Sequence, residues 1–171
     1  MKFNVFHKVL SFLSLFGLLI LIAGCPYSST VPIDEGTIKV PAGLEGQWIK
    51  VSDKESENPP YIEIRKEDKT NATALKYEFS SSDSIYESTT YHLTFSDVNG
   101  DVFMNVIEEG GTSYSLFKFV FDEKASEITT YEVTDYIKES FNTSAELKSY
   151  IAKNKDVGYF YTNTVDTYVR K

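Results

Sequence analysis

The sequence predicts an all-β protein, an antiparallel up-and-down barrel of about eight strands with one short helix before the last strand. Three observations lead to this fold class. From Leu44 onward, apolar and polar residues alternate with the period of two that is typical of strands. Short segments rich in Gly, Asn, Asp and Ser separate the alternating runs. One helix-capping motif interrupts the pattern near the C-terminus. The length of 171 residues fits a single domain.

The expected strands follow one another with short connections. They contain the runs Trp48–Val51, Ile62–Ile64, Leu75–Phe79, Tyr91–Phe95, Val102–Val106, Phe117–Phe121, Tyr131–Val133 and Tyr159–Arg170. Consecutive strands joined by short loops form an antiparallel meander. Closure into a barrel, from about Gly46 to Arg170, removes both unpaired edges of that meander. A β-sandwich, or an open sheet wrapped on the helix, is the alternative.

The register of one hairpin follows from the sequence. Asn99-Gly100 lies between two alternating runs and is typical of a two-residue turn, because both positions need a positive φ. Such a turn pairs Val98 with Asp101 and Phe95 with Met104. The apolar residues of both strands then share one face, so the turn and the hydrophobic pattern agree.

The single helix is expected near residues 143–154. Thr143 and Glu146 have the spacing of a capping box, in which the Thr side chain caps the first turn. Leu147, Tyr150 and Ile151 follow at i, i+3 and i+4 and form a narrow apolar stripe. This stripe predicts a helix that lies on another surface, either across a barrel mouth or against the outer wall.

Residues 1–24 have the features of a signal peptide. A short basic segment precedes the mostly apolar run Val9–Ala23, which is about 15 residues long and short of the ~20 that a membrane-spanning helix needs. The run ends in Leu21-Ile22-Ala23-Gly24-Cys25, which resembles the lipobox of bacterial lipoproteins. The resemblance implies cleavage between Gly24 and Cys25, attachment of diacylglycerol to the Cys25 thiol, and acylation of the new amino group, with palmitate among the expected chains.

The expected partner of Cys25 is therefore a membrane. Cys25 is the only Cys, so no internal disulfide competes for its thiol. Each buried CH₂ contributes ~0.8 kcal/mol, and two or three acyl chains make the anchoring stable. The resemblance implies a lipid-anchored protein of the cell envelope. In a host with two membranes we expect the outer one, because Pro26 follows the Cys instead of the Asp that marks inner-membrane retention in lipoproteins of some enteric bacteria.

Residues 25–43 are expected to form the lipidated Cys and an extended tether, and residues 44–171 the barrel domain. Three Pro residues and little apolar periodicity favour an extended spacer over residues 26–43. An ordered strap lying against the domain is the alternative, because Ile38 and Val40 alternate around Lys39 and could dock as a short strand.

Both ends of the barrel domain carry residues of a known motif. The segment Leu44–Trp48, with Gly46 and Trp48, resembles the Gly-x-Trp motif on the first strand of lipocalins and their calycin relatives. Tyr168-Val169-Arg170 is similar to the closing strand of small bacterial lipocalin-like lipoproteins, whose Arg packs over that Trp. The resemblance implies a structural seam in which the Arg170 guanidinium covers the Trp48 ring. The first and last strands of a closed eight-stranded meander are antiparallel neighbours, which agrees with this contact.

Composition and motifs exclude several functions. The formal net charge of −8 argues against a nucleic-acid partner, because such binding depends on Lys and Arg neutralising phosphates. No motif for a catalytic residue, a metal ligand or a cofactor can be assigned, and we expect no enzyme. His92 is the only His left after the expected cleavage, and alternation puts it on the polar face of a strand.

Two hypotheses remain for the function. The 12 Tyr and 12 Phe are the main excess in the composition, and most of them are expected in the core. A small eight-stranded barrel is either filled by such side chains or leaves room for one small ligand. The first hypothesis is a non-enzymatic binding module that holds a small apolar ligand in a lipocalin-like cup, with unknown ligand-binding residues. The second is a structural or interaction lipoprotein with a filled barrel, whose outer surface meets another envelope protein or a glycan.

Overall fold

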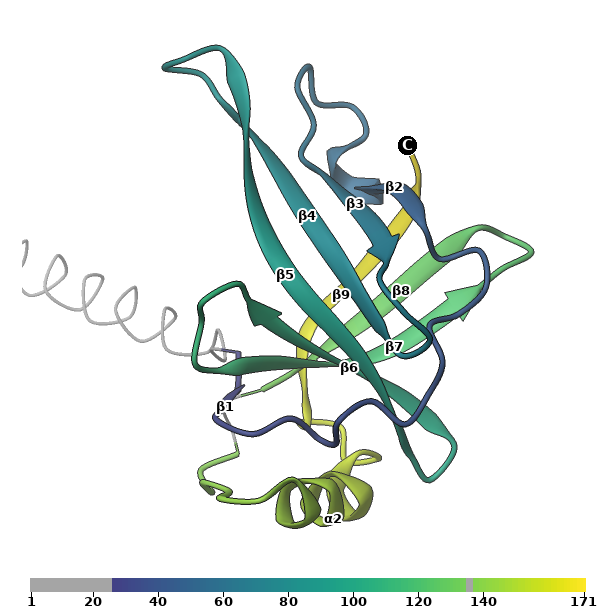
Figure 1. The fold of residues 1–171 in the computed structure, drawn as a ribbon, viewed down its shortest axis with the longest axis vertical. Helices are drawn as coiled ribbons and strands as arrows, with labels where there is room; N and C mark the ends of the chain where they lie inside the picture. Colours follow the sequence, from purple (N-terminus) through teal and green to yellow (C-terminus); the bar gives the residue numbers. More distant parts are fainter. Residues whose placement is uncertain (1–25, 135–136) are drawn as a thin grey trace, which may run out of the picture.

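The computed structural model describes residues 26–134 and 137–171. Eight antiparallel strands close into a barrel, in which each strand pairs with the next and the last pairs with the first (Figure 1). The predicted barrel is thereby confirmed. Its strands are β2 (Gly46–Lys50), β3 (Tyr61–Lys66), β4 (Asn71–Ser80), β5 (Ile85–Val98), β6 (Asp101–Glu108), β7 (Tyr114–Asp122), β8 (Glu127–Val133) and β9 (Tyr161–Arg170).

The two ends of the barrel differ in their connections. The short β3–β4, β5–β6 and β7–β8 turns lie at one end, together with the start of β2 and the end of β9. We call this the turn end; it lies to the right in Figure 1. The other four connections, including the β8–β9 connection with the helix, define the loop end.

The hairpin at Asn99-Gly100 has the predicted register. Both turn residues have positive φ, 53° at Asn99 and 87° at Gly100. Val98 pairs with Asp101, and Phe95 pairs with Met104. The two-residue turn therefore determines which face of β5 and β6 lines the barrel, because a shift of one residue would reverse every side chain.

The first expected strand is shorter than the sequence suggested. β2 ends at Lys50, and Val51–Asp53 forms a 3₁₀ turn, η2, in which the Val51 side chain is 46% exposed. The chain leaves the sheet at this point to enter the β2–β3 connection.

Two strands turn their larger side chains outward, against expectation. On β4, Ala72 and Ala74 are buried and pair with Leu93 and Tyr91 of β5, so that Leu75 and its alternates Tyr77 and Phe79 lie on the outer face. On β8, a register irregularity follows Tyr131, which also lies outside. Some of the aromatic residues expected in the core therefore line the outer wall, and small or polar side chains take the inner positions.

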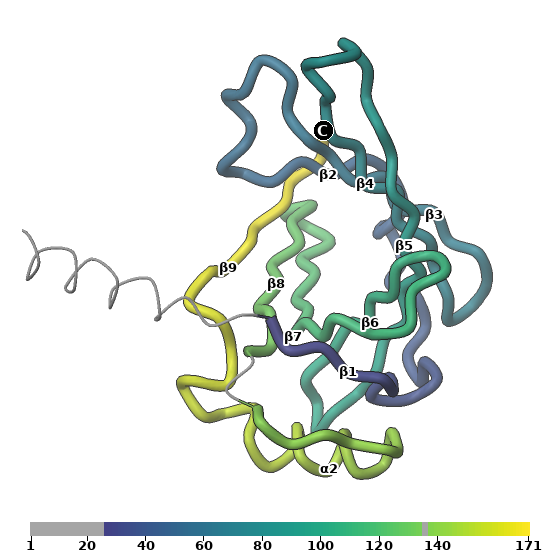
Figure 2. The backbone as a smooth tube through the Cα atoms, turned by 90° about the vertical axis from the view of Figure 1, so that its left-hand side faces the viewer, coloured from purple at the N-terminus to yellow at the C-terminus, as the bar shows by residue number. Residues whose placement is uncertain are grey.

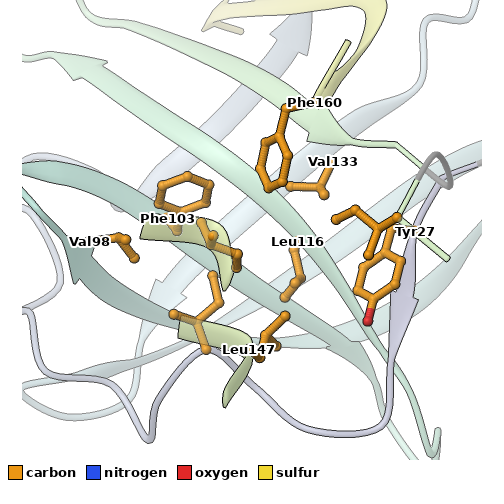
Figure 3. Close-up of a cluster of buried hydrophobic side chains, with 10 residues drawn as sticks. Tyr27, Val98, Phe103, Leu116, Val133, Leu147 and Phe160 are labelled. Carbon is orange, nitrogen blue, oxygen red and sulfur yellow. The ribbon is translucent and has the colours of Figure 1, made fainter. Parts of the chain in front are cut away.

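The helix α2 (Ser144–Asn154) lies against the outer wall of the barrel. The Thr143 hydroxyl accepts a hydrogen bond from the Glu146 amide at 3.3 Å, which confirms the predicted N-cap. Leu147 and Ile151 are fully buried in a cluster with outward-facing residues of β5, β6 and β7 (Figure 3): Val98, Phe103 and Leu116. In the described part of the chain, no helix is both long and apolar enough to cross a membrane.

Residues 26–43 are docked on the barrel, so that the strap alternative holds and the free extended tether does not. The strand β1 (Ser28–Ser29) pairs with the start of β7 (Figure 2), and Ile33 is fully buried. Further along, the Ile38 amide donates to the Phe95 carbonyl at 3.0 Å and the Val40 amide to the Lys69 carbonyl at 3.0 Å. We call residues 26–43 the strap. The predicted signal peptide, residues 1–24, and the lipidation site Cys25 lie outside the described residues.

Candidate functional site

A cavity of about 400 Å³ lies inside the barrel. Every barrel strand contributes to its wall, and the wall is mostly apolar. Its lining side chains are Trp48, Ile62, Ile64, Ala74, Lys76, Tyr91, Leu93, Met104, Val106, Ser115, Phe117, Phe119, Ile128, Thr130, Glu132 and Tyr168. An eight-stranded barrel is either filled by its own side chains or leaves room for one small ligand. This barrel leaves room.

Large aromatic side chains pack together at the turn end. Phe95 and Phe119 pack edge to face with ring centroids 5.1 Å apart, and Trp48 and Phe121 do so at 6.0 Å. Val40 from the strap joins the same cluster. Beyond these rings, Ala74 on β4 presents only a small side chain to the interior, which leaves space in the middle of the barrel.

The cavity becomes polar toward the loop end. Among the residues of β4 and β8 that line the cavity, Lys76 and Glu132 lie nearest to that end. A second pocket of about 270 Å³ shares Trp48, Ile62, Lys76 and Tyr168 with the cavity, and adds Lys50 and Asp166 to the wall. The interior thus has an apolar part and a charged part.

Most charges in this region have a partner. The Lys50 ammonium lies 2.6 Å from a carboxylate oxygen of Asp166, and the Lys76 ammonium lies 2.9 Å from Glu78. Glu132 differs: among residues 26–134 and 137–171, no Lys, Arg or His forms an ion pair with it. Burial raises the pKa of the Glu132 carboxyl, and the negative charge of Asp166 raises it further.

Tyr168 keeps its proton at neutral pH. Burial raises the pKa of Tyr168 to about 12, with smaller contributions from the acidic groups of Asp166, Asp53 and Glu132. Its phenol is therefore a neutral donor or acceptor at the border between the two pockets.

The seam of the barrel contains the contact expected between Trp48 and Arg170. The Arg170 guanidinium carbon lies 4.2 Å from the Trp48 ring centroid, and the two residues are paired across β2 and β9. The guanidinium also donates hydrogen bonds to the backbone carbonyls of Gly43 and Glu45. Gly46 has a φ of 126°, and a Cβ there would collide with Arg170 Nη1. The absence of a side chain at Gly46 therefore leaves room for the Arg170 guanidinium over the indole.

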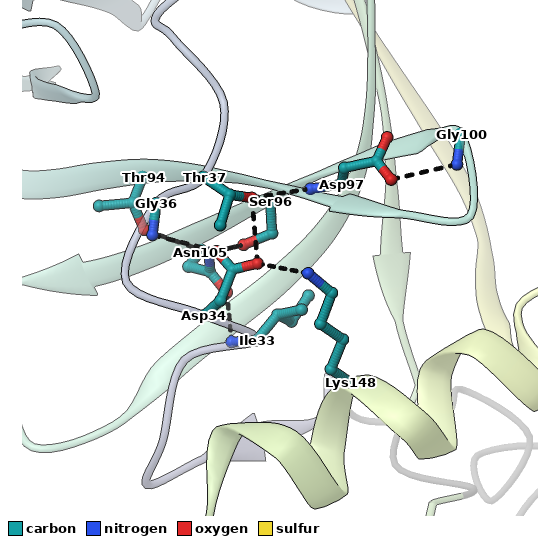
Figure 4. Close-up of polar contacts among 10 residues, drawn as sticks. All are labelled: Ile33, Asp34, Gly36, Thr37, Thr94, Ser96, Asp97, Gly100, Asn105 and Lys148. Carbon is teal, nitrogen blue, oxygen red and sulfur yellow. Dashed lines mark hydrogen bonds and ion pairs between the residues drawn. The ribbon is translucent and has the colours of Figure 1, made fainter.

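A buried polar network outside the barrel was missed from the sequence (Figure 4). The Asn105 side chain on β6 accepts from the Ile33 amide at 2.8 Å and donates to the Ser96 hydroxyl at 2.9 Å. Ser96 donates to Asp34 at 2.6 Å, and the Lys148 ammonium of α2 lies 2.7 Å from the same carboxylate. The network ties the strap, the sheet and the helix together, so its role is structural.

The network holds Asp34 in its charged form. Burial alone would raise the pKa of this carboxyl, but hydrogen bonds from Lys148, Ser96 and the Gly36 amide outweigh burial and lower the pKa below its ordinary value. A signal for this covered face was available in the sequence. Val98, Phe103 and Leu116 are apolar residues at positions that alternation assigns to solvent, which is typical of a strand covered on both faces.

Two further polar residues, His92 and Asp101, lie apart from the cavity. His92 is exposed on the outer face of β5, as alternation predicts. The Asp101 carboxylate pairs with Lys118 at 2.8 Å and with Lys155 at 2.5 Å. Across the described ranges, no group of three or more His, Cys, Asp or Glu could hold a metal ion.

The cavity residues themselves could not be named from the sequence. Polar residues at inner positions of a strand indicate a hydrated or ligand-lined region, and Lys76, Thr130 and Glu132 give such a signal once the inner face is known. Periodicity alone does not show which face of a strand is the inner one, and on β4 and β8 the larger apolar residues point outward.

Comparison with known proteins does not identify the chain. No family model, no curated protein and no solved structure matches it. The resemblances to lipoproteins and lipocalins therefore depend on the residues quoted above.

Proposed function

We propose that this chain is a lipid-anchored lipoprotein of the cell envelope that holds a small, largely apolar ligand inside its barrel and performs no catalysis. The observation that carries the proposal is the cavity of about 400 Å³ with its mostly apolar wall. Small-molecule sites have volumes of roughly 300–1,000 Å³, apolar linings and a few polar groups that orient the ligand. The cavity has each of these properties.

The docked strap supports an anchor that holds the barrel close to the membrane. Pro26 forms a β-bridge with Thr134, at the loop end of β8. A lipid on Cys25 would therefore begin one residue from the body of the domain. A free spacer of the same 18 residues would instead allow a separation of roughly 60 Å.

The test is to look for a retained ligand. The unlipidated domain, purified from its own host, should show an added mass in native mass spectrometry. Replacing Ala74, a cavity-wall residue that is 6% exposed, by Trp should fill the interior and abolish retention. Ala125→Trp in the exposed β7–β8 turn is the matched control and should retain the ligand. A wild-type domain with no added mass and no uptake of apolar probes would contradict the proposal.

One observation favours the second candidate, an interaction lipoprotein. Four aromatic side chains form a continuous strip on the outer wall, where Tyr61 stacks on Tyr77 at 4.5 Å, and Tyr86 contacts both Tyr61 and Phe79 at 5.4 Å. The strip extends onto the long β4–β5 hairpin, which projects from the barrel in Figure 1. Changes of Tyr77 and Tyr86 to Ser that remove a function in the host without altering ligand retention would favour this candidate.

A further inference from the structure

We propose that the ligand of the barrel carries a protonated amine beside its apolar body, and that the Glu132 carboxylate is the counter-ion of that amine. The inference rests on the proposed ligand-binding function and specifies the chemical class of the ligand. It follows from which charges in the cavity are paired and which charge is not.

Glu132 lies beside apolar residues of the cavity wall, at the level where the polar head group of a ligand would lie. It lines the cavity at its loop end, and its neighbour in the β7–β8 register is Phe117, which lines the same wall. Ile128 and Phe119 lie deeper, toward the turn end. A ligand whose apolar body occupies the deep part would therefore bring its polar group to the level of Glu132.

The charges along the cavity wall favour a cation over an anion as the polar group of the ligand. Lys76 also lines the cavity, but it already has Glu78 as an ion-pair partner, just as Lys50 has Asp166. A ligand carboxylate would have to compete with Glu78 and would bring a second negative charge near Glu132. A ligand ammonium would instead neutralise the Glu132 carboxylate, which has no ion-pair partner among the described residues, and a partly buried charge is costly without a partner. Phe117 and Tyr91 line the same wall, and aromatic rings attract cations.

The preference for an amine over a neutral ligand should depend on pH, because Glu132 loses its charge when it is protonated. The charged groups that face this region are Asp166, Lys50 and Asp53, and the Lys76–Glu78 pair across the barrel, with the neutral phenol of Tyr168 between them. Burial and Asp166 raise the pKa of Glu132, so the empty cavity loses the carboxylate charge at a higher pH than an exposed Glu does. Binding of an amine should therefore weaken as the pH falls and Glu132 becomes protonated, whereas binding of a neutral ligand should not change.

Three probes with the same apolar body test the inference: decylamine, decanol and decanoate, below their aggregation concentrations. Trp48 is the only Trp and lines the cavity, so its fluorescence reports occupancy. We expect the unlipidated domain to bind decylamine at least about tenfold more tightly than decanol, equivalent to about 1.4 kcal/mol. Glu132→Gln should reduce this ratio to near one while leaving the affinity for decanol unchanged.

Glu127→Gln is the matched control. Glu127 lies on the same strand at an alternate position and faces away from the cavity, so this variant should keep the preference for decylamine. If Glu132→Gln does not fold, the pH dependence of the two affinities in the wild-type domain provides the same test.

The outcomes separate the inference from the function on which it rests. Tighter binding of decanoate than of decylamine, or an amine preference that persists in Glu132→Gln, would overturn the inference and leave the binding function intact. Failure of all three probes to bind, decanol included, would overturn the binding function and the inference with it.

Discussion

Replacing Arg170 by Ala should destabilise the barrel where its first and last strands meet. The change removes the guanidinium that covers the Trp48 ring at 4.2 Å and donates to two backbone carbonyls that precede β2. It leaves the cavity wall unchanged, because Arg170 does not line the cavity. We therefore expect lower stability and unaltered ligand binding.

The size of the expected loss of stability follows from the contacts that Arg170 makes. A cation–π contact at an exposed site contributes ~0.5–1 kcal/mol, and each hydrogen bond to a solvated carbonyl contributes about 0.5–1.5 kcal/mol. Arg170 is exposed, so the loss should lie near 2 kcal/mol, at the lower part of the combined range. For a domain of this length, 2 kcal/mol corresponds to a decrease in Tm of about 4–8 °C. Arg170→Lys should retain part of the stability, because an ammonium cannot stack as a planar group.

Urea denaturation followed by Trp48 fluorescence measures this loss directly, because the only Trp lies beneath the altered side chain. Arg65→Ala is the matched control. Arg65 is the other Arg of the chain, and its ion pair with Glu63 is exposed, so its removal should change the midpoint far less. An Arg170→Ala variant as stable as the wild type would refute the reasoning and show that the seam is held by its backbone ladder alone.

Three further predictions follow. Gly46→Ala should displace the Arg170 guanidinium and also strain the backbone at φ 126°, so the double variant with Arg170→Ala should lose less stability in urea than the sum of the two single losses, whereas full additivity would contradict a shared contact. The pKa of Asp34 is lowered in the folded state, so the Asp34 charge stabilises the fold above the ordinary pKa of 3.8. This stabilisation is lost as the pH falls through the lowered pKa of the folded state. Asp34→Asn should therefore be less stable at pH about 7 and lose less stability than wild type by pH about 3, as urea midpoints would show; equal pH dependence would refute this. Cys25→Ala should abolish both lipidation and signal cleavage in the host, which intact mass and radiolabelled fatty acid would report; label in the variant would refute the anchor.

Features with a local cause could be predicted from the sequence. The turn at Asn99-Gly100 and the N-cap at Thr143 are determined by the conformations of a few adjacent residues, and both agree with the structure. The contact between Trp48 and Arg170 spans the whole domain, but it follows from the closure of the barrel, which makes the first and last strands neighbours.

The inner face of a strand depends on its neighbours and was harder to predict. Periodicity shows that Leu75 and Tyr77 share a face, but not which side that face is on. Pairing with β3 places Ala74 beside Ile64, so the small residue faces inward and the larger ones face outward. The cavity depends on this choice, because its volume is the space that a large side chain on β4 would have filled. Asn105 was missed for a related reason, since the face on which it lies is covered by segments distant in the sequence, among them the docked strap and α2.

The path of the strap connects the proposed anchor with the proposed binding site. The strap begins at the bridge between Pro26 and Thr134, two residues beyond Glu132, and reaches Lys69 at the turn end through Val40. Under the proposed lipidation of Cys25, the acyl chains would start beside the loop end, where the cavity has its charged groups. An amphiphile in the membrane surface would then be concentrated at the end of the barrel that carries Glu132. The docked strap would thus keep the loop end close to the membrane, whereas a free tether of 18 residues would allow the barrel to lie roughly 60 Å from it.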